Sequence, residues 1–192
     1  MRRSLLLALL FLLPACPPPD EPLEPIGEVA AFTLSDHTGA DFGRAELDGK
    51  VWVVDFFFTR CASICPHMTQ AMRELKERHA GAEDLGLLSF TIDPDFDTPE
   101  VLRAYAERMS LPLDGWHFVT GERAAIAELS LQSFKLAFGE EMDEEGHILH
   151  SSRFVLVDRQ GRVRGYYDGL DESLRPRLDR AVRHLLDEPG GE

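Results

Sequence analysis

The sequence predicts an α/β domain built on a central mixed sheet flanked by helices. Two short apolar runs, 51–57 and 85–92, are rich in Val, Leu and Phe, as is typical of strands buried on both faces of a sheet. An amphipathic segment follows each run, and the last third of the chain adds a hairpin pattern and another amphipathic segment. This alternation indicates one domain with a sizeable core.

The composition is that of a soluble globular domain with an acidic surface. Of the 192 residues, 44% are hydrophobic and 28% are charged, and the formal net charge is −14. Such a charge argues against nucleic acid or anionic lipid as a binding partner.

The first fifteen residues have the layout of an export signal. Two arginines precede the apolar run Leu5 to Leu13, which is too short to span a membrane as a permanent helix. A leucine three places before Cys16 and an alanine directly before it match a bacterial lipoprotein processing site. We therefore expect residues 1–15 to be a lipoprotein signal peptide and Cys16 to carry the lipid, with an ordinary signal peptide or a plain anchor as the alternative.

Export defines how the rest of the chain is organised. Residues 16–26 are acidic and rich in proline, which predicts a stiff, extended linker between the membrane and the domain. The folded domain is expected over 27–187, followed by a short tail over 188–192. Cleavage before Cys16 removes two arginines and no acid, so the formal charge becomes −16. We expect the lipid-anchored domain to work on the periplasmic side of a bacterial membrane, where unpaired thiols tend to oxidise.

The first half of the domain leads into the strand 51–57. Short apolar pieces around a polar turn predict a hairpin over 30–42, ahead of this strand. The strand ends in a turn that carries Cys61 and Cys65, and Pro66 suits the first turn of the helix that follows. The two cysteines therefore lie where strand gives way to helix.

The next elements continue the alternation of helix and strand. Apolar residues recur at helical spacing over 68–79, and 85–92 then forms the second buried strand. Thr98 is suited to cap the following helix, with Pro99 at its first position. A short strand over 116–119 and a helix over 122–134 follow.

The end of the chain completes the fold. A charged loop over 140–145 precedes two alternating segments, 153–158 and 162–167, which predict an antiparallel hairpin. Residues 172–186 form a closing amphipathic helix. This order is that of a thioredoxin-like domain, with extra elements inserted between Pro94 and Gly146.

Cys61 and Cys65 are the residues most suited to chemistry. Beside Arg60 and near the N-terminal end of a helix, a thiolate is stabilised relative to the thiol. Two thiolates that can meet form a site for Cu(I) or Zn, and equally a pair able to form a disulfide. The spacing does not separate these uses. A structural disulfide remains a third alternative, although so short a loop gains little entropy from closure.

A third ligand would favour a metal site. Of the seven histidines, His150 stands just before the strand 154–157, a position that lies opposite the cysteine-bearing turn in a thioredoxin-like domain. A neutral imidazole that joins two thiolates makes a trigonal soft site. The alternative for His150 is a surface or hydrogen-bonded histidine, which is the role that we expect for His67 and His147.

Three blocks of the sequence resemble the SCO/SenC family, the membrane-attached, thioredoxin-fold copper proteins of respiratory oxidase assembly. The blocks are FFFTRCASICP, TIDPDFDTPEVLRAY and HSSRFVLVD. The resemblance implies that Cys61, Cys65 and His150 bind one copper ion, as Cu(I) or Cu(II). It also implies that the protein delivers copper to the binuclear copper centre of a cytochrome c oxidase subunit, or to another copper-handling protein.

The resemblance extends to two aspartates. Asp93 and Asp97 correspond to a loop near the metal in that family, so they are candidates for supporting the ligands or docking the partner. Turn and helix-cap roles are the alternative for both. The chain departs from the family at Ala62, where many members have proline, and at Leu149, where an acid often precedes the histidine.

Asp55 and the cysteine pair also support a redox hypothesis. Asp55 stands six residues before Cys61, where thioredoxins carry a buried acid that exchanges protons with the second cysteine. Burial should raise the pKa of Asp55, because strand alternation places it with Val53 and Phe57; a simple hydrogen-bonded acid is the alternative. The rival to a copper chaperone is therefore an enzyme, a periplasmic thiol-disulfide oxidoreductase that cycles a redox-active disulfide between Cys61 and Cys65.

Overall fold

The computed structural model describes residues 23–139 and 148–189. The expected signal peptide, Cys16, most of the linker, the charged loop 140–145 and His147 lie outside these residues. The strands are β1 (Gly27–Glu28), β2 (Thr33–Asp36), β3 (Asp41–Gly43), β4 (Val51–Phe57), β5 (Leu85–Thr91), β6 (Trp116–Thr120), β7 (Arg153–Val157) and β8 (Arg162–Asp168). The helices are η1 (Arg44–Leu47), α1 (Cys65–Arg78), α2 (Pro99–Arg108), α3 (Arg123–Gln132), η2 (Glu172–Leu174) and α4 (Arg175–Asp187).

One mixed sheet of eight strands runs through the described part of the chain, in the order β1-β8-β7-β4-β5-β6-β2-β3. The pairs β4–β5 and β5–β6 are parallel, and the other pairs are antiparallel. The predicted N-terminal hairpin is present as β2 and β3, and it extends the sheet beyond β6. The thioredoxin-like α/β fold predicted from the order of elements is confirmed.

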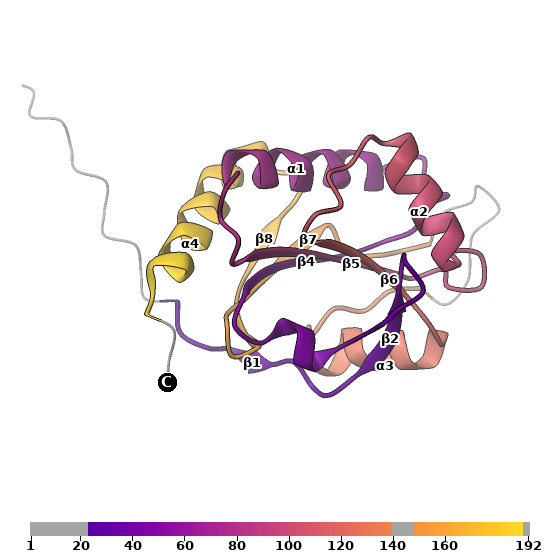
Figure 1. The fold of residues 1–192 in the computed structure, drawn as a ribbon, viewed down its shortest axis with the longest axis horizontal. Coiled ribbons are helices and arrows are strands. Elements are labelled where there is room, and N and C mark those ends of the chain that lie inside the picture. Colours follow the sequence, from indigo (N-terminus) through magenta and orange to yellow (C-terminus); the bar gives the residue numbers. More distant parts are fainter. Residues whose placement is uncertain (1–22, 140–147, 190–192) are drawn as a thin grey trace, which may run out of the picture.

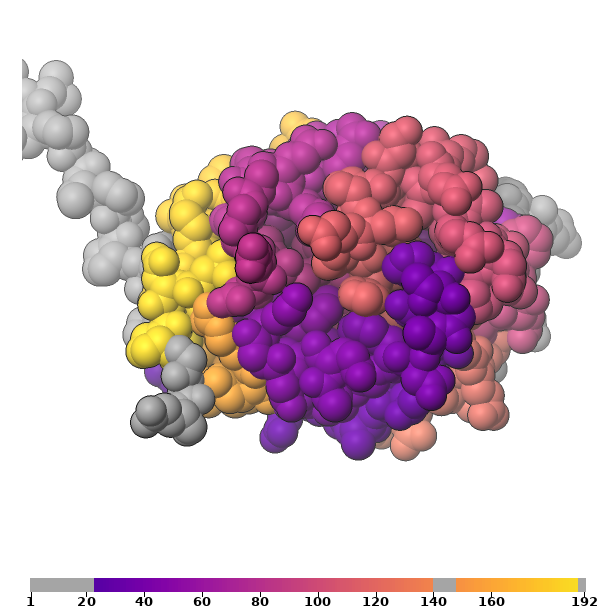
Figure 2. Space-filling view, viewed as in Figure 1, coloured from indigo at the N-terminus to yellow at the C-terminus, as the bar shows by residue number. Residues whose placement is uncertain are grey.

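Helices cover both faces of the sheet (Figure 1). Helices α1, α2 and α4 lie on one face, and α3 lies on the other. In Figure 2 the indigo and purple N-terminal segment covers a broad area in the lower part of the face shown. None of the helices in 23–139 and 148–189 is long and apolar enough to cross a membrane.

The central strands are buried along their whole length, as their apolar sequences predict. Every residue of β4 and β5 is buried, and alternate side chains enter the two layers of the core. Phe57 packs edge-on against Phe118 and contacts Tyr105 of α2, whereas Phe56 stacks on Phe90 on the other face. Side-chain packing on both faces of the sheet therefore holds the central strands in fixed positions.

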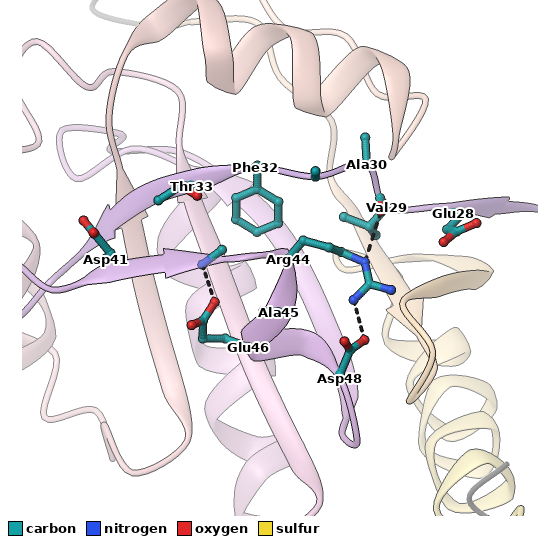
Figure 3. A pocket seen from close by; sticks show the side chains of 12 residues that line it. Glu28, Val29, Ala30, Phe32, Thr33, Asp41, Arg44, Ala45, Glu46 and Asp48 are labelled. Carbon is teal, nitrogen blue, oxygen red and sulfur yellow. Dashed lines mark hydrogen bonds and ion pairs between the residues drawn. The ribbon is translucent and has the colours of Figure 1, made fainter. Parts of the chain in front are cut away.

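Arg44 fastens the N-terminal segment to the rest of the domain (Figure 3). Its Nε donates to the carbonyl oxygen of Val29 at 3.1 Å, and its Nη1 pairs with Asp48 at 2.5 Å. Its Nη2 donates to the carbonyl oxygen of Gln160, in the turn between β7 and β8. One guanidinium thus joins the two chain regions that flank the central strands.

Gly86 makes room for an aromatic side chain that lies over the neighbouring strand. Trp52 on β4 lies against Gly86 on β5, so closely that a Cβ at Gly86 would lie 2.4 Å from the indole ring. The Trp52 ring then reaches Phe42, and its Nε1 donates to the carbonyl oxygen of Leu47 at 3.0 Å. Only a residue without a side chain leaves this space.

We predict that Gly86→Ala lowers the free energy of unfolding by about 1–3 kcal/mol, because an added methyl group overpacks the core against Trp52. Gly27→Ala is the matched control, since its nearest contact would be the carbonyl oxygen of Ser133 at 3.8 Å. We expect the control to change stability by less than about 0.5 kcal/mol. Denaturant unfolding of both variants tests the prediction, and equal stabilities would contradict it.

Candidate metal centre

The two cysteines occupy the turn between β4 and α1. Cys65 is the first residue of α1, and Pro66 directly after it lies in the first turn, where a missing amide donor costs nothing. Cys61 lies in the preceding turn, and its backbone amide donates to the carbonyl oxygen of Phe58 at 3.2 Å. Both thiols are free and buried, with 7% of Cys61 and 1% of Cys65 exposed.

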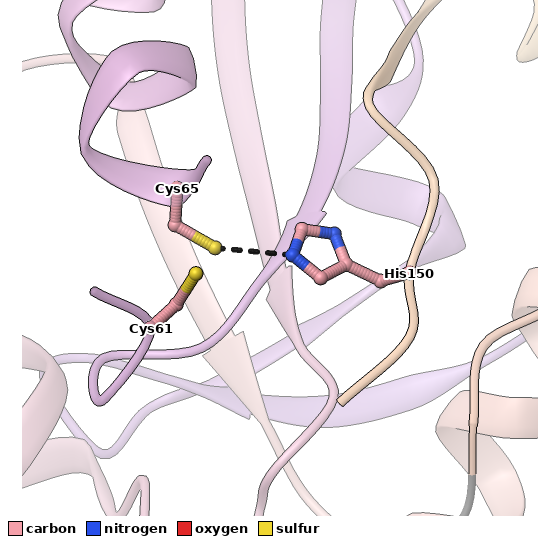
Figure 4. Close-up of side chains that lie close together, drawn as sticks. All are labelled: Cys61, Cys65 and His150. Atoms are coloured by element: carbon pink, nitrogen blue, oxygen red, sulfur yellow. Dashed lines mark hydrogen bonds between the residues drawn. The ribbon is translucent and has the colours of Figure 1, made fainter. Parts of the chain in front are cut away.

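His150 reaches this turn because of the way β7 pairs with β4. The two strands are antiparallel, with Val54 opposite Val155, so the residues that precede β7 lie beyond the C-terminal end of β4. The cysteine-bearing turn leaves from that same end. Residues 85 positions apart in the sequence therefore become neighbours, with Cys65 Sγ and His150 Nε2 3.3 Å apart (Figure 4).

The imidazole is held with one nitrogen directed at the thiols. His150 Nδ1 lies 3.1 Å from the carbonyl oxygen of Ser151, an acceptor only, so Nδ1 carries the proton. Nε2 is then the unprotonated nitrogen, and it faces Cys65. The ring also packs edge-on against Phe58, with a centroid separation of 5.8 Å. The orientation of His150 is thus fixed on two sides.

The donor atoms of Cys61, Cys65 and His150 all lie within 4.8 Å of one another. Two sulfurs and one unprotonated imidazole nitrogen are soft and borderline donors, which suit Cu(I) and Zn²⁺. The three residues singled out from the sequence are therefore brought together, in a geometry that a single soft metal ion fits.

The two thiols differ in acidity. The hydrogen bond that the Cys65 thiol donates lowers the pKa of Cys61, and a bond from Ser63 lowers it further, although burial acts in the opposite direction. The same hydrogen bond raises the pKa of Cys65, and burial adds to the rise. The first thiolate to form is therefore on Cys61, which can act as a ligand or as a nucleophile.

Asp55 lies inside the core on the α1 face of β4. Burial raises its pKa to about 6, although a hydrogen bond from Ser89 acts in the opposite direction. Its Oδ1 has no hydrogen-bond partner among the described residues. The carboxylate also contributes to the raised pKa of Cys65. Asp55 is buried, as the sequence predicted, and its charge influences the pKa of the Cys65 thiol.

Asp97 ties the cysteine-bearing turn to the end of β5. It is fully buried, and its carboxylate accepts hydrogen bonds from the amide of Thr59 at 3.1 Å and from the hydroxyl of Thr91 at 2.5 Å. The hydroxyl of Thr59 donates to the second oxygen. Burial raises the pKa of Asp97 despite these bonds. Asp97 thereby fixes the backbone two residues before Cys61.

Asp93 holds the next residue of the turn. Arg60 Nε donates to Asp93 Oδ2 at 3.0 Å, and the guanidinium of Arg60 lies 4.2 Å from the ring centroid of Phe96. Arg123 approaches the other carboxylate oxygen at 3.5 Å. Sequence reasoning did not single out Thr59 or Thr91, since isolated threonines in strand and turn segments carry no signal of a partner.

Comparisons with known proteins agree on one family. A family model described as SCO1/SenC matches residues 21–186. Over 148 residues, the chain is 36% identical to the SCO1 protein homolog of Bacillus subtilis, which covers 76% of each chain.

Solved structures agree with the sequence comparisons. A SCO1/SenC family lipoprotein from Bacillus anthracis superposes with a TM-score of 0.78 at 30% identity, covering 85% of this chain and 98% of that one. BsSco, a member of the Sco family of cytochrome c oxidase assembly proteins in which a disulfide switch was identified, gives 0.77 at 32% identity, with 86% and 98% covered. Yeast Sco1 with copper bound shares the fold, with a TM-score of 0.68 at 22% identity over 85% and 91% of the two chains.

We predict that Asp97→Ala lowers the free energy of unfolding by about 1–3 kcal/mol, because it leaves the Thr59 amide and the Thr91 hydroxyl without their acceptor. Asp95→Ala is the control: its side chain is 81% exposed and pairs with Arg123 at the surface, so we expect a change below about 0.5 kcal/mol. Urea unfolding measures both. An Asp97 variant as stable as the control would show that the turn is held by other contacts.

Proposed function

The chain belongs to the SCO1/SenC family, and from that premise we propose that it is a copper chaperone of respiratory oxidase assembly. In this proposal Cys61, Cys65 and His150 hold one copper ion. The protein delivers it to the binuclear copper centre of a cytochrome c oxidase subunit, or to another copper-handling protein. The function is then metal binding and transfer rather than turnover.

One observation carries the proposal: the unprotonated Nε2 of His150 lies beside two free thiols that converge on it. Two thiolates and one imidazole form a trigonal set that prefers Cu(I), and the same donors also suit Zn²⁺ in vitro. The relative with copper bound, yeast Sco1, has the same fold. Copper is therefore the ion that we assign to this site.

The surroundings of the site suit transfer by ligand exchange. Cys61 and Cys65 are buried, but the intervening Ala62 and Ser63 are exposed, and Leu149 beside the third ligand is 82% exposed. A receiving protein can therefore approach the sulfurs from the exposed side of the site, which we call the rim, while the core behind them excludes water. The apolar Leu149 offers a contact for such a partner.

We place the protein on the periplasmic side of the membrane, anchored through a lipid on Cys16. The layout of residues 1–15 and the family lipoprotein from Bacillus anthracis support this placement. The linker 16–26 would let the domain reach a membrane-bound oxidase subunit, since proline-rich segments act as extended spacers.

We predict that His150→Ala weakens Cu(I) binding by more than about 100-fold. The loss of a residue that only orients a metal ligand costs about 10–100-fold, and His150 is itself a ligand in this proposal. Competition with a chromophoric Cu(I) chelator measures the affinity of the reduced protein. His67→Ala is the matched control, because His67 is exposed on α1. An unchanged affinity in the His150 variant would remove this imidazole from the ligand set and count against the chaperone.

A second function is favoured by Asp55 and by the unequal acidities of the thiols. We propose that the same pair can reduce a client disulfide. The Cys61 thiolate attacks one client sulfur, forms a mixed disulfide and releases the other client sulfur as a thiolate. Asp55 then accepts the proton of the Cys65 thiol, directly or through water, and the Cys65 thiolate attacks Cys61. The client is released with its disulfide reduced by two electrons to a pair of thiols or thiolates, and a Cys61–Cys65 disulfide remains.

We predict that Asp55→Asn slows this disulfide reduction by at least about tenfold and leaves Cu(I) affinity unchanged, because it removes a proton acceptor and no metal ligand. With a pKa of about 6, Asp55 is ionised above that pH, so the wild-type rate should fall as the pH drops through 6. The variant should lack this inflection. Stopped-flow reduction of a disulfide substrate tests both points, and identical pH profiles would eliminate Asp55 as the acceptor.

A further inference from the structure

A second group of metal-ligating side chains lies away from the cysteines. A carboxylate oxygen of Asp36 and a ring nitrogen of each of His37 and His117 all lie within 4.8 Å of one another. Among the described residues, only this group and the cysteine centre bring three such side chains together. The proposed copper chemistry does not use it.

The group forms where β2 and β6 meet (Figure 1). These strands are antiparallel, and Asp36 at the end of β2 lies opposite Val119. His117, two residues before Val119, points to the same face and is the diagonal neighbour of Asp36. His37 is the first residue of the turn that follows β2, and its ring nitrogen Nδ1 accepts a long hydrogen bond from the amide of Phe118 at 3.4 Å. The lone pair on Nδ1 is the one that an ion would take in place of this amide, because Nε2 carries the proton in that tautomer. The pairing of the two strands thus brings all three side chains together.

This group is separated from the cysteines by the width of the central strands. Leu88 on β5 pairs with Val54 on one side and with His117 on the other, so His117 is level with the middle of β4 and two strands away from it. The cysteine-bearing turn leaves the C-terminal end of β4. An ion bound here would therefore not share a ligand with the thiol site.

The Asp36 carboxylate is positioned for a ligand on one oxygen. Its Oδ1 accepts hydrogen bonds from the amide and hydroxyl of Thr38, at 2.8 and 2.5 Å, so this oxygen is fixed by the turn. Its Oδ2 lies 3.1 Å from His117 Nδ1. Donors that share one ion through bonds of about 2.0–2.2 Å lie roughly 3–4 Å apart, so Asp36 and His117 already have the required separation.

The surroundings limit hydration of the group. Asp36 and His37 are buried, and the His117 ring packs 4.6 Å from Phe42. The His117 side chain is 32% exposed and is the side of the group that solvent reaches. An ion entering there would replace the proton between Asp36 and His117, which can move to His117 Nε2. Arg103 lies within electrostatic range of His37 and opposes a cation, so we expect moderate affinity.

We propose that Asp36, His37 and His117 form a second metal site, which takes a borderline divalent ion such as Zn²⁺. Two imidazoles and one carboxylate are the set that Zn²⁺ binds with an open position, and they lack the thiolates that Cu(I) prefers. The thiol site can hold Cu(I), whereas the donors of this group do not favour it. The sequence carries no signal of this site, because 81 positions separate Asp36 from His117.

The test uses the full chain, purified in detergent, with Cys61→Ser, Cys65→Ser and His150→Ala combined to remove the thiol site. Calorimetric titration with Zn²⁺ should show saturable binding of one equivalent. Co²⁺, as a spectroscopic substitute, should give visible d–d bands without thiolate charge-transfer absorption. Adding His117→Ala should weaken Zn²⁺ binding by at least about tenfold, whereas His67→Ala should not.

Two further variants separate ligation from folding. Asp36→Asn keeps the oxygen that the Thr38 turn needs and removes the charge, so it should lose Zn²⁺ affinity while its circular dichroism stays unchanged. His117 is partly exposed, which makes His117→Ala informative even if a change at the buried His37 unfolds the domain. No saturable Zn²⁺ binding, or binding that survives both His117→Ala and Asp36→Asn, would overturn the proposal.

Discussion

The antiparallel pairing of β7 with β4 is the constraint on which the rest of the site depends. It places the residues ahead of β7 at the end of β4 from which the cysteine-bearing turn leaves. Without that register, His150 would not lie beside Cys65, which is 85 positions earlier in the chain. The pairing is itself secured by the core, since β4 is buried on both faces and β7 is buried along four of its five residues.

Hydrogen bonds around the thiols hold the cysteine-bearing turn and the imidazole in a conformation that suits metal binding or disulfide formation. Asp97 holds Thr59, Asp93 holds Arg60, and the carbonyl oxygen of Ser151 fixes the tautomer of His150. These contacts restrict the backbone and the imidazole, whereas the rim at Ala62 and Ser63 stays exposed. A rigid base with an open rim suits a site that must give up its ion. It also suits a cysteine pair that must meet a client disulfide.

The elements with the strongest local signals could be predicted from the sequence. The apolar runs of β4 and β5, and Pro66 in the first turn of α1, reflect interactions between near neighbours in the chain. The position of the cysteines between strand and helix singled them out as possible ligands, whereas the resemblance of the motif blocks to a family decided in favour of His150 as the third ligand. The supporting threonines, and the meeting of Asp36 with His117, depend on strand pairing between distant segments, which composition and periodicity do not reveal. Gly86 is a similar case, because this position requires glycine only on account of the Trp52 ring on the neighbouring strand.

The central claim is that one copper ion is held jointly by Cys61, Cys65 and His150. X-ray absorption spectroscopy at the copper edge, on the reduced full chain loaded with one equivalent of Cu(I), tests it most directly. The account predicts a three-coordinate copper with two sulfur scatterers and one nitrogen scatterer, together with the outer-shell signature of an imidazole. A spectrum with two sulfurs and no imidazole, or a chain that retains no copper, would contradict it.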